Sequence, residues 1–193
     1  MKKILIGTHN PGKFKEIAYL ISKKYKKLSP VALKIKSPKE TGKTFISNSK
    51  IKVNFFSKFV NCPVISDDSG LCIKSLNNRP GIYSARLAKK HGSFLQAMKF
   101  ILNKLKKKKN RSATFVCCLS YKKKYHSEIV TVEGKIKGKI SSKILGKKGF
   151  GYDPIFIPNN KKITFGQMSK LTKIKMDHRF IAFKKLKKKI KTL

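Results

Sequence analysis

One repeated pattern constrains the fold of this chain more than any other feature. A short apolar run ends in turn-forming or polar residues, and apolar residues with helical spacing follow it. The first run covers residues 3–8, and the turn formers within residues 9–13 follow it directly. Apolar side chains then recur with helical spacing at Phe14, Ile17, Leu20 and Ile21. This order predicts a strand, a tight loop and a helix. The helix N-terminus either binds an anion through its N–H groups or belongs to an ordinary βα turn.

The same alternation continues along the chain and predicts an α/β fold. Thr44 is a suitable N-cap for a helix that extends to about residue 60, and residues 63–66 form a strand that leads into Asp67. We expect further strands at residues 31–35, 71–76 and 155–157, helices at residues 93–105 and 180–190, a hairpin of residues 112–121 and 128–136, and a loop at residues 137–149. Strands that alternate with helices, with one late hairpin, favour a mixed β-sheet over a purely parallel one. The length of 193 residues favours a single domain over residues 1–193.

The chain is strongly basic, with 48 Lys and Arg against 8 Asp and Glu and a net charge of +40. Such a balance is typical of nucleic-acid-binding proteins, but these usually use Arg to recognise phosphates and bases. Only four of the 48 cationic residues are Arg, and the lysines are spread over the whole chain. We therefore interpret the excess as a bias of genome composition and expect no specific nucleic-acid partner. A basic nucleic-acid-binding protein is the alternative function.

Membrane insertion and export both lack a signal in the sequence. No run of 18 or more apolar residues occurs, and the apolar run after Met1 is too short for a signal peptide. The four cysteines form no C-x-x-C pair, and each lies in or beside an apolar segment, which argues against a zinc or disulfide framework. We expect a cytoplasmic protein with no membrane partner.

Carboxylates are so scarce that each one requires an explanation. Asp67 and Asp68 lie side by side at the end of a predicted strand, directly before a Ser-Gly sequence. Two such carboxylates favour a site for Mg²⁺ and substrate phosphates, with an Asx turn as the alternative. Asn48 and Lys52 are four residues apart and share one face of a predicted helix, which either reaches a phosphate near these carboxylates or faces solvent.

Six sequence blocks follow one another between Thr8 and Arg179. They are residues 8–16, 40–48, 67–71, 80–86, 149–156 and 178–179. Lys52 lies four residues beyond the second of these blocks. In content and order they resemble the blocks T-x-N-x-x-K-x-x-E, E-T-G-x-T-F-x-x-N, D-D-S-G-L, P-G-x-Y-S-A-R, G-F-G-Y-D-P-I-F and H-R of the inosine/xanthosine triphosphate pyrophosphatases. The chain departs from that family at Asp177, where Ser is usual.

The resemblance implies an elongated mixed sheet flanked by helices, in two lobes with a nucleotide cleft between them. It also implies a homodimer that uses Mg²⁺ to convert ITP, dITP or XTP to the monophosphate and pyrophosphate, which cleanses the nucleotide pool. Glu40 and Asp68 would hold the metal, and Asp68 would also be the catalytic proton acceptor. The residues implied to contact the substrate are Thr8, His9, Asn10, Pro11, Gly12, Lys13, Ser69, Phe150, Gly151, Tyr152, Asp153, Lys173, His178 and Arg179.

The residue types also fit this chemistry without reference to a family. Cleavage between the α and β phosphorus atoms needs cations, a positioned water and a base. Lys13, Lys52 and Lys173 supply cations, and either carboxylate of the adjacent Asp67 and Asp68 could accept the proton of the water. No Walker-type phosphate loop is present, which excludes a P-loop NTPase.

Selection of the base depends on hydrogen-bond donors. Arg179 is donor-only and His178 can donate, which favours a 6-oxo purine over adenine. Phe150 or Tyr152 could stack on the base, although both are equally consistent with core aromatics. We expect Glu16 to brace its loop or to pair with a Lys rather than to touch the substrate. A related pyrophosphatase acting on other modified nucleotides, such as pyrimidines, is the closer alternative.

Overall fold

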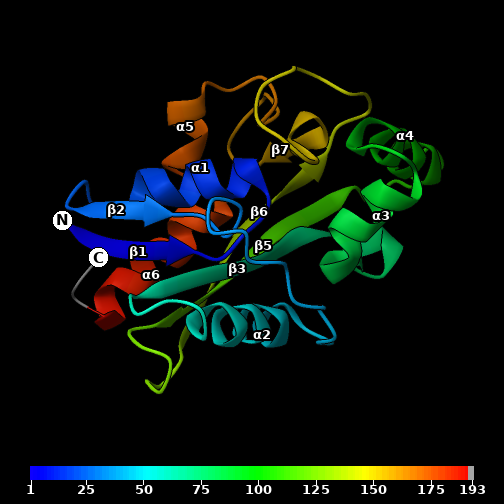
Figure 1. The fold of residues 1–193 in the computed structure, drawn as a ribbon. Coiled ribbons are helices and arrows are strands. Elements are labelled where there is room, and N and C mark those ends of the chain that lie inside the picture. The colour runs from blue at the N-terminus through cyan, green and yellow to red at the C-terminus, as the bar shows by residue number, and fades with distance from the viewer. Residues whose placement is uncertain (191–193) are drawn as a thin grey trace. The chain divides into compact units, whose positions relative to one another are not determined.

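The computed structural model describes residues 1–190, and Figure 1 shows their helices and strands. The strands are β1 (Lys2–Ile6), β2 (Tyr25–Leu28), β3 (Val64–Ile73), β4 (Arg79–Pro80), β5 (Ser112–Lys122), β6 (Val130–Ile140) and β7 (Phe156–Pro158). The α-helices are α1 (Pro11–Leu20), α2 (Phe45–Ser57), α3 (Ser84–Lys90), α4 (Phe94–Lys104), α5 (Lys170–Ile174) and α6 (His178–Ile190). Short 3₁₀ helices cover η1 (Lys74–Leu76), η2 (Gly81–Tyr83) and η3 (Asp153–Ile155).

Within residues 1–190 the strands form one seven-stranded mixed sheet in the order β2-β1-β3-β5-β6-β7, and β4 pairs with β3. β1 is parallel to both β2 and β3, with Leu5 opposite Leu28 on one side and Val64 on the other. The pairs β3–β4 and β6–β7 are antiparallel. The predicted α/β fold with a mixed sheet is confirmed. No helix in the described part of the chain is both long enough and apolar enough to span a membrane.

The chain divides into two compact units, and β3, β5 and β6 each contribute residues to both. Unit 1 comprises Met1–Asp68, Cys117–Gly134 and the described part of Arg179–Leu193. Unit 2 comprises Ser69–Val116 and Lys135–His178.

In unit 1, alternate residues of β1 and β3 pack on opposite faces of the sheet, as the two-residue period of a strand requires. Ile6 and Ile65 pack on one face with Ile17 of α1 and Ala182 of α6. On the other face, Val64 packs with Phe56 of α2. Helices α1 and α6 therefore cover one face of this part of the sheet, and α2 covers the other.

The core of unit 2 is built around aromatic side chains. Phe115 of β5, Phe156 of β7 and Phe165 contact one another, with ring centroids 4.6 to 6.2 Å apart. Residues of β3, α3, α4 and β6 complete the same cluster. This core supports the segment of residues 149–156, within which the family resemblance implies that residues 150–153 contact the substrate.

The strand expected at residues 31–35 is wrong. The strand beside β1 is instead Tyr25–Leu28, and residues 31–34 form a turn in which Lys34 has a φ of 54°. A residue with positive φ interrupts a strand, and Val31 is 63% exposed. The apolar run was misleading because only Ile35 packs against the core beneath α2.

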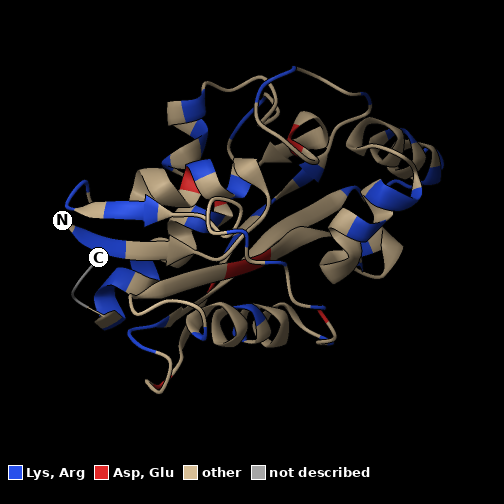
Figure 2. Ribbon diagram, in the orientation of Figure 1, with Lys and Arg blue, Asp and Glu red and all other residues tan. Residues whose placement is uncertain are grey.

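The acidic pair lies inside a strand and not at a strand end, which corrects a second expectation. β3 continues through Asp67 and Asp68 as far as Ile73, and Figure 2 shows the acidic residues in the middle of the strand. Gly70 does not mark a turn. A side chain there would put its Cβ 2.1 Å from the carbonyl oxygen of Gly81, so the glycine allows close approach of two backbone segments.

The helix predictions hold with shifted ends. Thr44 caps α2 as predicted, and its side chain accepts a hydrogen bond from the backbone N–H of Ser47 over 3.0 Å, but the helix ends at Ser57. Asn10 caps α1, so most of the expected loop of residues 9–13 is the first helical turn. Of the expected helix at residues 93–105, α4 covers Phe94–Lys104. The five-residue helix α5 was missed, and β6 extends into the expected loop as far as Ile140.

Candidate active site

The two adjacent carboxylates of β3 point to opposite faces of the sheet in unit 1. Successive side chains of a strand alternate between faces, so Asp67 shares the face of Ile65, and Asp68 shares that of Val64. Asp67 therefore faces α1 and α6, whereas Asp68 faces α2. Each carboxylate consequently has its own set of partners.

Asp68 is surrounded by polar groups of α2 and of the segment before it. The amide Nδ2 of Asn48 donates to Asp68 Oδ2 over 3.2 Å, and Lys52 Nζ lies 3.7 Å from Asp68 Oδ1. The same Lys52 ammonium lies 2.7 Å from Glu40 Oε1. Asn48 also accepts a hydrogen bond from the backbone N–H of Gly42 over 2.8 Å, which ties the Glu40 segment to the helix. The shared face of Asn48 and Lys52 is thus directed at carboxylates.

Asp67 belongs to a chain of ion pairs on the opposite face. Its Oδ2 lies 3.1 Å from Lys13 Nζ and 3.7 Å from Arg179 Nε. The Nη1 group of Arg179 in turn donates to Glu16 Oε2 over 2.8 Å. Asp67 is fully buried, and the side chains of Arg179 and Glu16 are nearly so. Glu16 was expected to brace its loop or to pair with a Lys, and the structure pairs it with Arg179.

The start of α1 holds the remaining predicted phosphate-binding residues. Asn10 Oδ1 accepts from the backbone N–H of Lys13 over 3.0 Å, and Thr8 Oγ1 accepts from the N–H of Asn10 over 3.2 Å. Pro11 and Gly12 form the first turn of the helix. This end of a ten-residue helix presents a positive dipole end close to the Lys13 side chain. His9 is exposed, and its Nε2 lies 2.9 Å from the carbonyl oxygen of Ile35.

The charged groups around Asp67 and Asp68 shift the pKa values of the two aspartates in opposite directions. Burial alone would raise the pKa of Asp67, but the charges of Lys13, Arg179 and Lys52 outweigh it and hold that pKa well below its usual value. Burial raises the pKa of Asp68, and the negative charges of Glu40 and Asp67 add to this effect against Lys52 and Lys13. Burial would lower the pKa of Lys52, but the carboxylates around it raise the pKa instead.

A divalent cation fits the oxygen donors around Asp68. Among residues 1–190, no three His, Cys, Asp or Glu side chains form a metal-binding group. Mg²⁺ does not need three, because it is commonly held by one or two carboxylates together with waters and substrate phosphates. Glu40 and Asp68 are candidates for such a pair, and the Lys52 ammonium lies within ion-pair distance of both.

Unit 2 contains a second group of predicted site residues, centred on Lys173. Its ammonium lies 2.5 Å from Asp153 Oδ2 and 4.6 Å from the centre of the Phe150 ring. The same carboxylate oxygen accepts the backbone N–H of Phe150 over 2.8 Å. Gly149 has a φ of 76°, and a Cβ at this position would lie 2.1 Å from Asp153 Oδ2. The glycine therefore permits the tight turn that places Phe150 beside Lys173.

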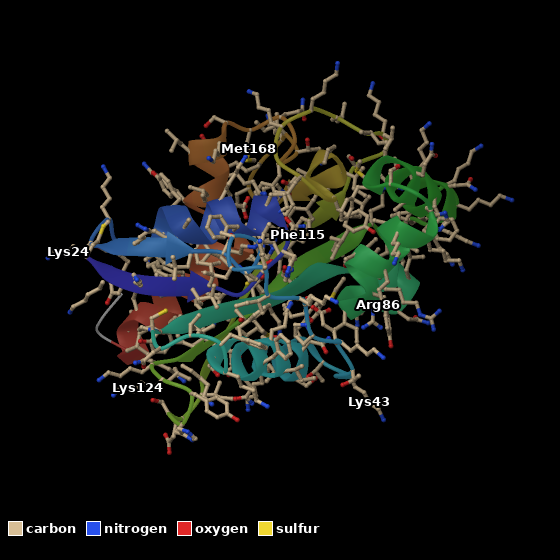
Figure 3. All side chains as sticks on the ribbon, viewed as in Figure 1. Lys24, Lys43, Arg86, Phe115, Lys124 and Met168 are labelled. Carbon is tan, nitrogen blue, oxygen red and sulfur yellow. The ribbon has the colours of Figure 1, made fainter. Side chains whose placement is uncertain are left out.

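The other predicted residues of unit 2 differ in burial. Tyr152 is 2% exposed, and its hydroxyl donates to the carbonyl oxygen of Ser84 over 2.9 Å. His178 is 2% exposed, and its ring stacks on Phe115, labelled in Figure 3, with centroids 4.8 Å apart. Ser69 is half-buried in β3, and Gly151 has a φ of 65°. The environment of Tyr152 matches the core alternative rather than a base-stacking ring.

Comparison with known proteins establishes the family. The sequence model of the Ham1 family matches residues 4–189. The chain belongs to the Ham1 family. It is 37% identical over 187 residues to a dITP/XTP pyrophosphatase of Caulobacter vibrioides, covering 96% of each chain. It is 40% identical over 193 residues to the dITP/XTP pyrophosphatase of Bacillus subtilis, covering 97% of this chain and 96% of that one.

Solved Ham1 structures have the same fold. A HAM1 protein from Coxiella burnetii superposes with a TM-score of 0.88 at 29% identity and full coverage of both chains. The Ham1 protein of Staphylococcus aureus superposes with a TM-score of 0.86 at 34% identity, covering 98% of each chain. The resemblance found from the sequence blocks is therefore confirmed at the level of family and fold.

Two features of this Ham1-family chain were not apparent from its sequence. Ser84 links three segments, because its Oγ donates to the carbonyl of Gly81, accepts the N–H of Leu71, and its own carbonyl accepts from Tyr152. Gly42 approaches Asn48 so closely that a Cβ there would lie 2.6 Å from Asn48 Oδ1. The only sequence signal for Ser84 and Gly42 was that each lies within one of the six blocks that resemble the family.

Proposed function

We propose that this Ham1-family chain hydrolyses non-standard purine nucleoside triphosphates to the monophosphate and pyrophosphate. One observation in the structure carries the proposal, namely that Lys52 joins Glu40 to Asp68 in unit 1. A buried carboxylate beside a cation site is the arrangement that phosphoanhydride hydrolysis needs. Relatives named dITP/XTP pyrophosphatase, which align with this chain over 96% of their own length, support the substrate class.

Asp68 accepts the proton of the attacking water in this proposal. Its raised pKa makes it a stronger base than an exposed aspartate, and the hydrogen bond from Asn48 fixes the orientation of its carboxylate. Oδ2 accepts from Asn48, and the proposal assigns the proton to Oδ1. Lys52 lies 3.7 Å from Oδ1, where its charge stabilises the ionised carboxylate before the transfer.

The triphosphate binds to the positive groups of unit 1. Lys13 supplies an ammonium, and the first turn of α1 supplies N–H groups and the positive end of its dipole. Glu40 and Asp68 would hold Mg²⁺, which supplies charge neutralisation on phosphate oxygens when it is bound. The positive charge of Lys52 then offsets negative charge on these carboxylates and on the bound phosphates.

The residues proposed to bind the base lie in unit 2. Phe150 supplies the stacking ring, and Lys173 and His178 supply hydrogen-bond donors. A 6-oxo purine presents an acceptor where adenine presents an amino donor, so a donor-lined site rejects adenine by leaving groups unsatisfied. Asp153 keeps Lys173 in place through their ion pair.

A panel of nucleoside triphosphates tests the proposal. In the presence of Mg²⁺, ITP, dITP and XTP are expected to yield pyrophosphate and the monophosphate much faster than ATP, measured by ³¹P NMR of the products. Release of orthophosphate with a diphosphate would contradict the cleavage position. Equal turnover of ATP would contradict base selection, and preferred turnover of a modified pyrimidine triphosphate would favour the related-enzyme alternative.

Assembly and compartment are parts of the same proposal. A cytoplasmic homodimer fits the family resemblance and the location of the nucleoside triphosphate pool. Light scattering coupled to gel filtration tests the dimer, for which a molar mass of twice 22.0 kDa is expected. A mass of one chain at all concentrations would contradict it.

A further inference from the structure

The proposed mechanism gives Asp67 no role. Yet Asp67 is the most deeply buried carboxylate of the unit 1 cluster, which comprises the ion-paired residues Lys13, Glu16, Glu40, Lys52, Asp67, Asp68 and Arg179. Its side chain is 0% exposed, compared with 29% for Glu40. Burial of an ionised carboxylate is costly unless charged partners compensate it. The partners of Asp67 therefore indicate what it does.

Two cations lie within ion-pair distance of Asp67. Lys13 comes from the first turn of α1, and Arg179 comes from the start of α6. Glu16 holds the other end of Arg179, which completes a row of two cations and two carboxylates in which only Lys13 is half-buried rather than buried. Asp67 is the member of this row that contacts both cations.

Strand alternation separates Asp67 from the proposed metal site. Asp68 points to the α2 face, where it shares the Lys52 ammonium with Glu40. Asp67 points to the α1 and α6 face, where it faces Lys13 and Arg179. Two neighbouring aspartates of a strand are poorly placed to hold one ion together.

We infer that Asp67 is a positioning residue that orients the Lys13 ammonium for the triphosphate and the Arg179 guanidinium for the base, and that it is not a metal ligand. This inference rests on the proposed function. A lysine is held in one direction only if an opposite charge fixes it, because its four-carbon stem is flexible. Asp67 thus supports substrate affinity and base preference, whereas Asp68 supports the chemical step.

A double-mutant cycle between Asp67 and Lys13 tests the inference. Asp67→Asn is expected to raise KM for ITP by roughly 10–100-fold and to leave the Mg²⁺ concentration for half-maximal activity within about threefold of the parent. It is also expected to lower the preference for ITP over ATP. Once Lys13→Gln is present, Asp67→Asn should raise KM by less than about tenfold, because only its effect through Arg179 remains.

Glu128→Gln is the matched control, because it removes one negative charge from an exposed side chain of unit 1 outside the site. It is expected to leave KM and the Mg²⁺ requirement unchanged. A rise of tenfold or more in the half-activating Mg²⁺ concentration for Asp67→Asn would identify Asp67 as a metal ligand and overturn the inference. Full additivity of the two substitutions would overturn it as well.

Loss of a buried charge could prevent Asp67→Asn from folding. The double variant Lys13→Gln with Asp67→Asn removes one charge of each sign and is expected to fold, with a melting temperature above that of Asp67→Asn alone. Its KM is then compared with that of Lys13→Gln, and a further rise of tenfold or more would again overturn the inference.

Calorimetry with inorganic triphosphate separates this inference from the proposed function. Parent protein is expected to bind triphosphate, and Lys13→Gln and the double variant are expected to bind it equally weakly. If the parent released no pyrophosphate from ITP, the proposed function would fail, but the binding comparison would still decide the role of Asp67. Weaker binding by the double variant than by Lys13→Gln would overturn the inference.

Discussion

The side-chain amide of Asn48 donates a hydrogen bond to Asp68 Oδ2 over 3.2 Å. The carbonyl oxygen of the same amide accepts the backbone N–H of Gly42 over 2.8 Å. One side chain therefore fixes the carboxylate of β3 and the segment that carries Glu40. A buried amide with both ends satisfied holds a single orientation, and such outer partners orient the groups that bind a metal.

Replacing Asn48 tests this arrangement. Asn48→Ala is expected to lower kcat/KM for ITP by roughly 10–100-fold and to raise the Mg²⁺ concentration needed for half-maximal activity, because Glu40 and Asp68 lose their common support. Steady-state kinetics over a Mg²⁺ titration measures both quantities. Asn54→Ala is the control, since Asn54 lies on the same helix but bonds Lys122 instead. Equal effects of the two substitutions would contradict the proposed role of Asn48.

Asp68→Asn tests the proton acceptor. The substitution keeps the shape of the side chain but removes its basicity, so kcat is expected to fall by roughly 10²–10⁴-fold. The melting temperature at neutral pH should stay equal or rise, because an ionised group with a raised pKa costs stability above that pKa. A kcat within about tenfold of the parent at saturating Mg²⁺ would show that Asp68 is not the base.

The pH profile of the parent enzyme tests the same residue without a substitution. A base must be ionised to act, so kcat is expected to decline as the pH falls through the pKa of Asp68. Burial and the neighbouring Glu40 and Asp67 charges raise that pKa. Bound Mg²⁺ would lower the pKa of this carboxyl, so the raised value is measured in the metal-free protein. There the carboxyl resonance of Asp68, followed by NMR, should titrate with a midpoint above about 3.9, the ordinary value for an aspartate. A midpoint at or below that value would contradict the raised pKa.

Local sequence signals predicted most of the elements but only some of their ends. Thr44 marked the start of α2 because a cap acts on the residues directly after it. Residues 31–35 misled because an apolar composition does not distinguish a strand from a turn whose side chains are exposed. The five-residue helix α5 is too short for a periodic pattern to show.

The sequence predicted which residues form the unit 1 cluster, but it did not predict which of them pair with one another. Scarcity of carboxylates pointed to Asp67 and Asp68, but their division between two faces follows from β3 continuing beyond them. That continuation depends on Gly70 and Gly81 approaching each other across 11 residues of sequence. The ion pair between Glu16 and Arg179 joins residues 163 apart, and no local signal connects them.

The net charge of +40 predicts weak and sequence-indifferent binding of nucleic acid. Figure 2 shows Lys and Arg on many elements of both units, and Lys24, Lys43 and Lys124 extend outward in Figure 3. Scattered lysines attract phosphates mainly through release of counterions, so affinity should fall steeply with salt. Fluorescence anisotropy with single-stranded DNA is expected to give a Kd no tighter than about 10⁻⁶ M at physiological salt. Tight binding that persists at that salt concentration would favour a nucleic-acid-binding function.

Phe150 and Tyr152, the first two aromatic residues of the segment 149–156, are expected to differ in function. Tyr152→Phe removes the hydrogen bond to Ser84 and should cost about 0.5–1.5 kcal/mol of stability, with KM for ITP unchanged. Phe150→Ala should raise KM for ITP roughly tenfold or more, because an aromatic stack on a base contributes about 1–3 kcal/mol. Chemical denaturation and steady-state kinetics on both variants measure these effects. A similar rise in KM for Tyr152→Phe would place the hydroxyl of Tyr152 in substrate binding.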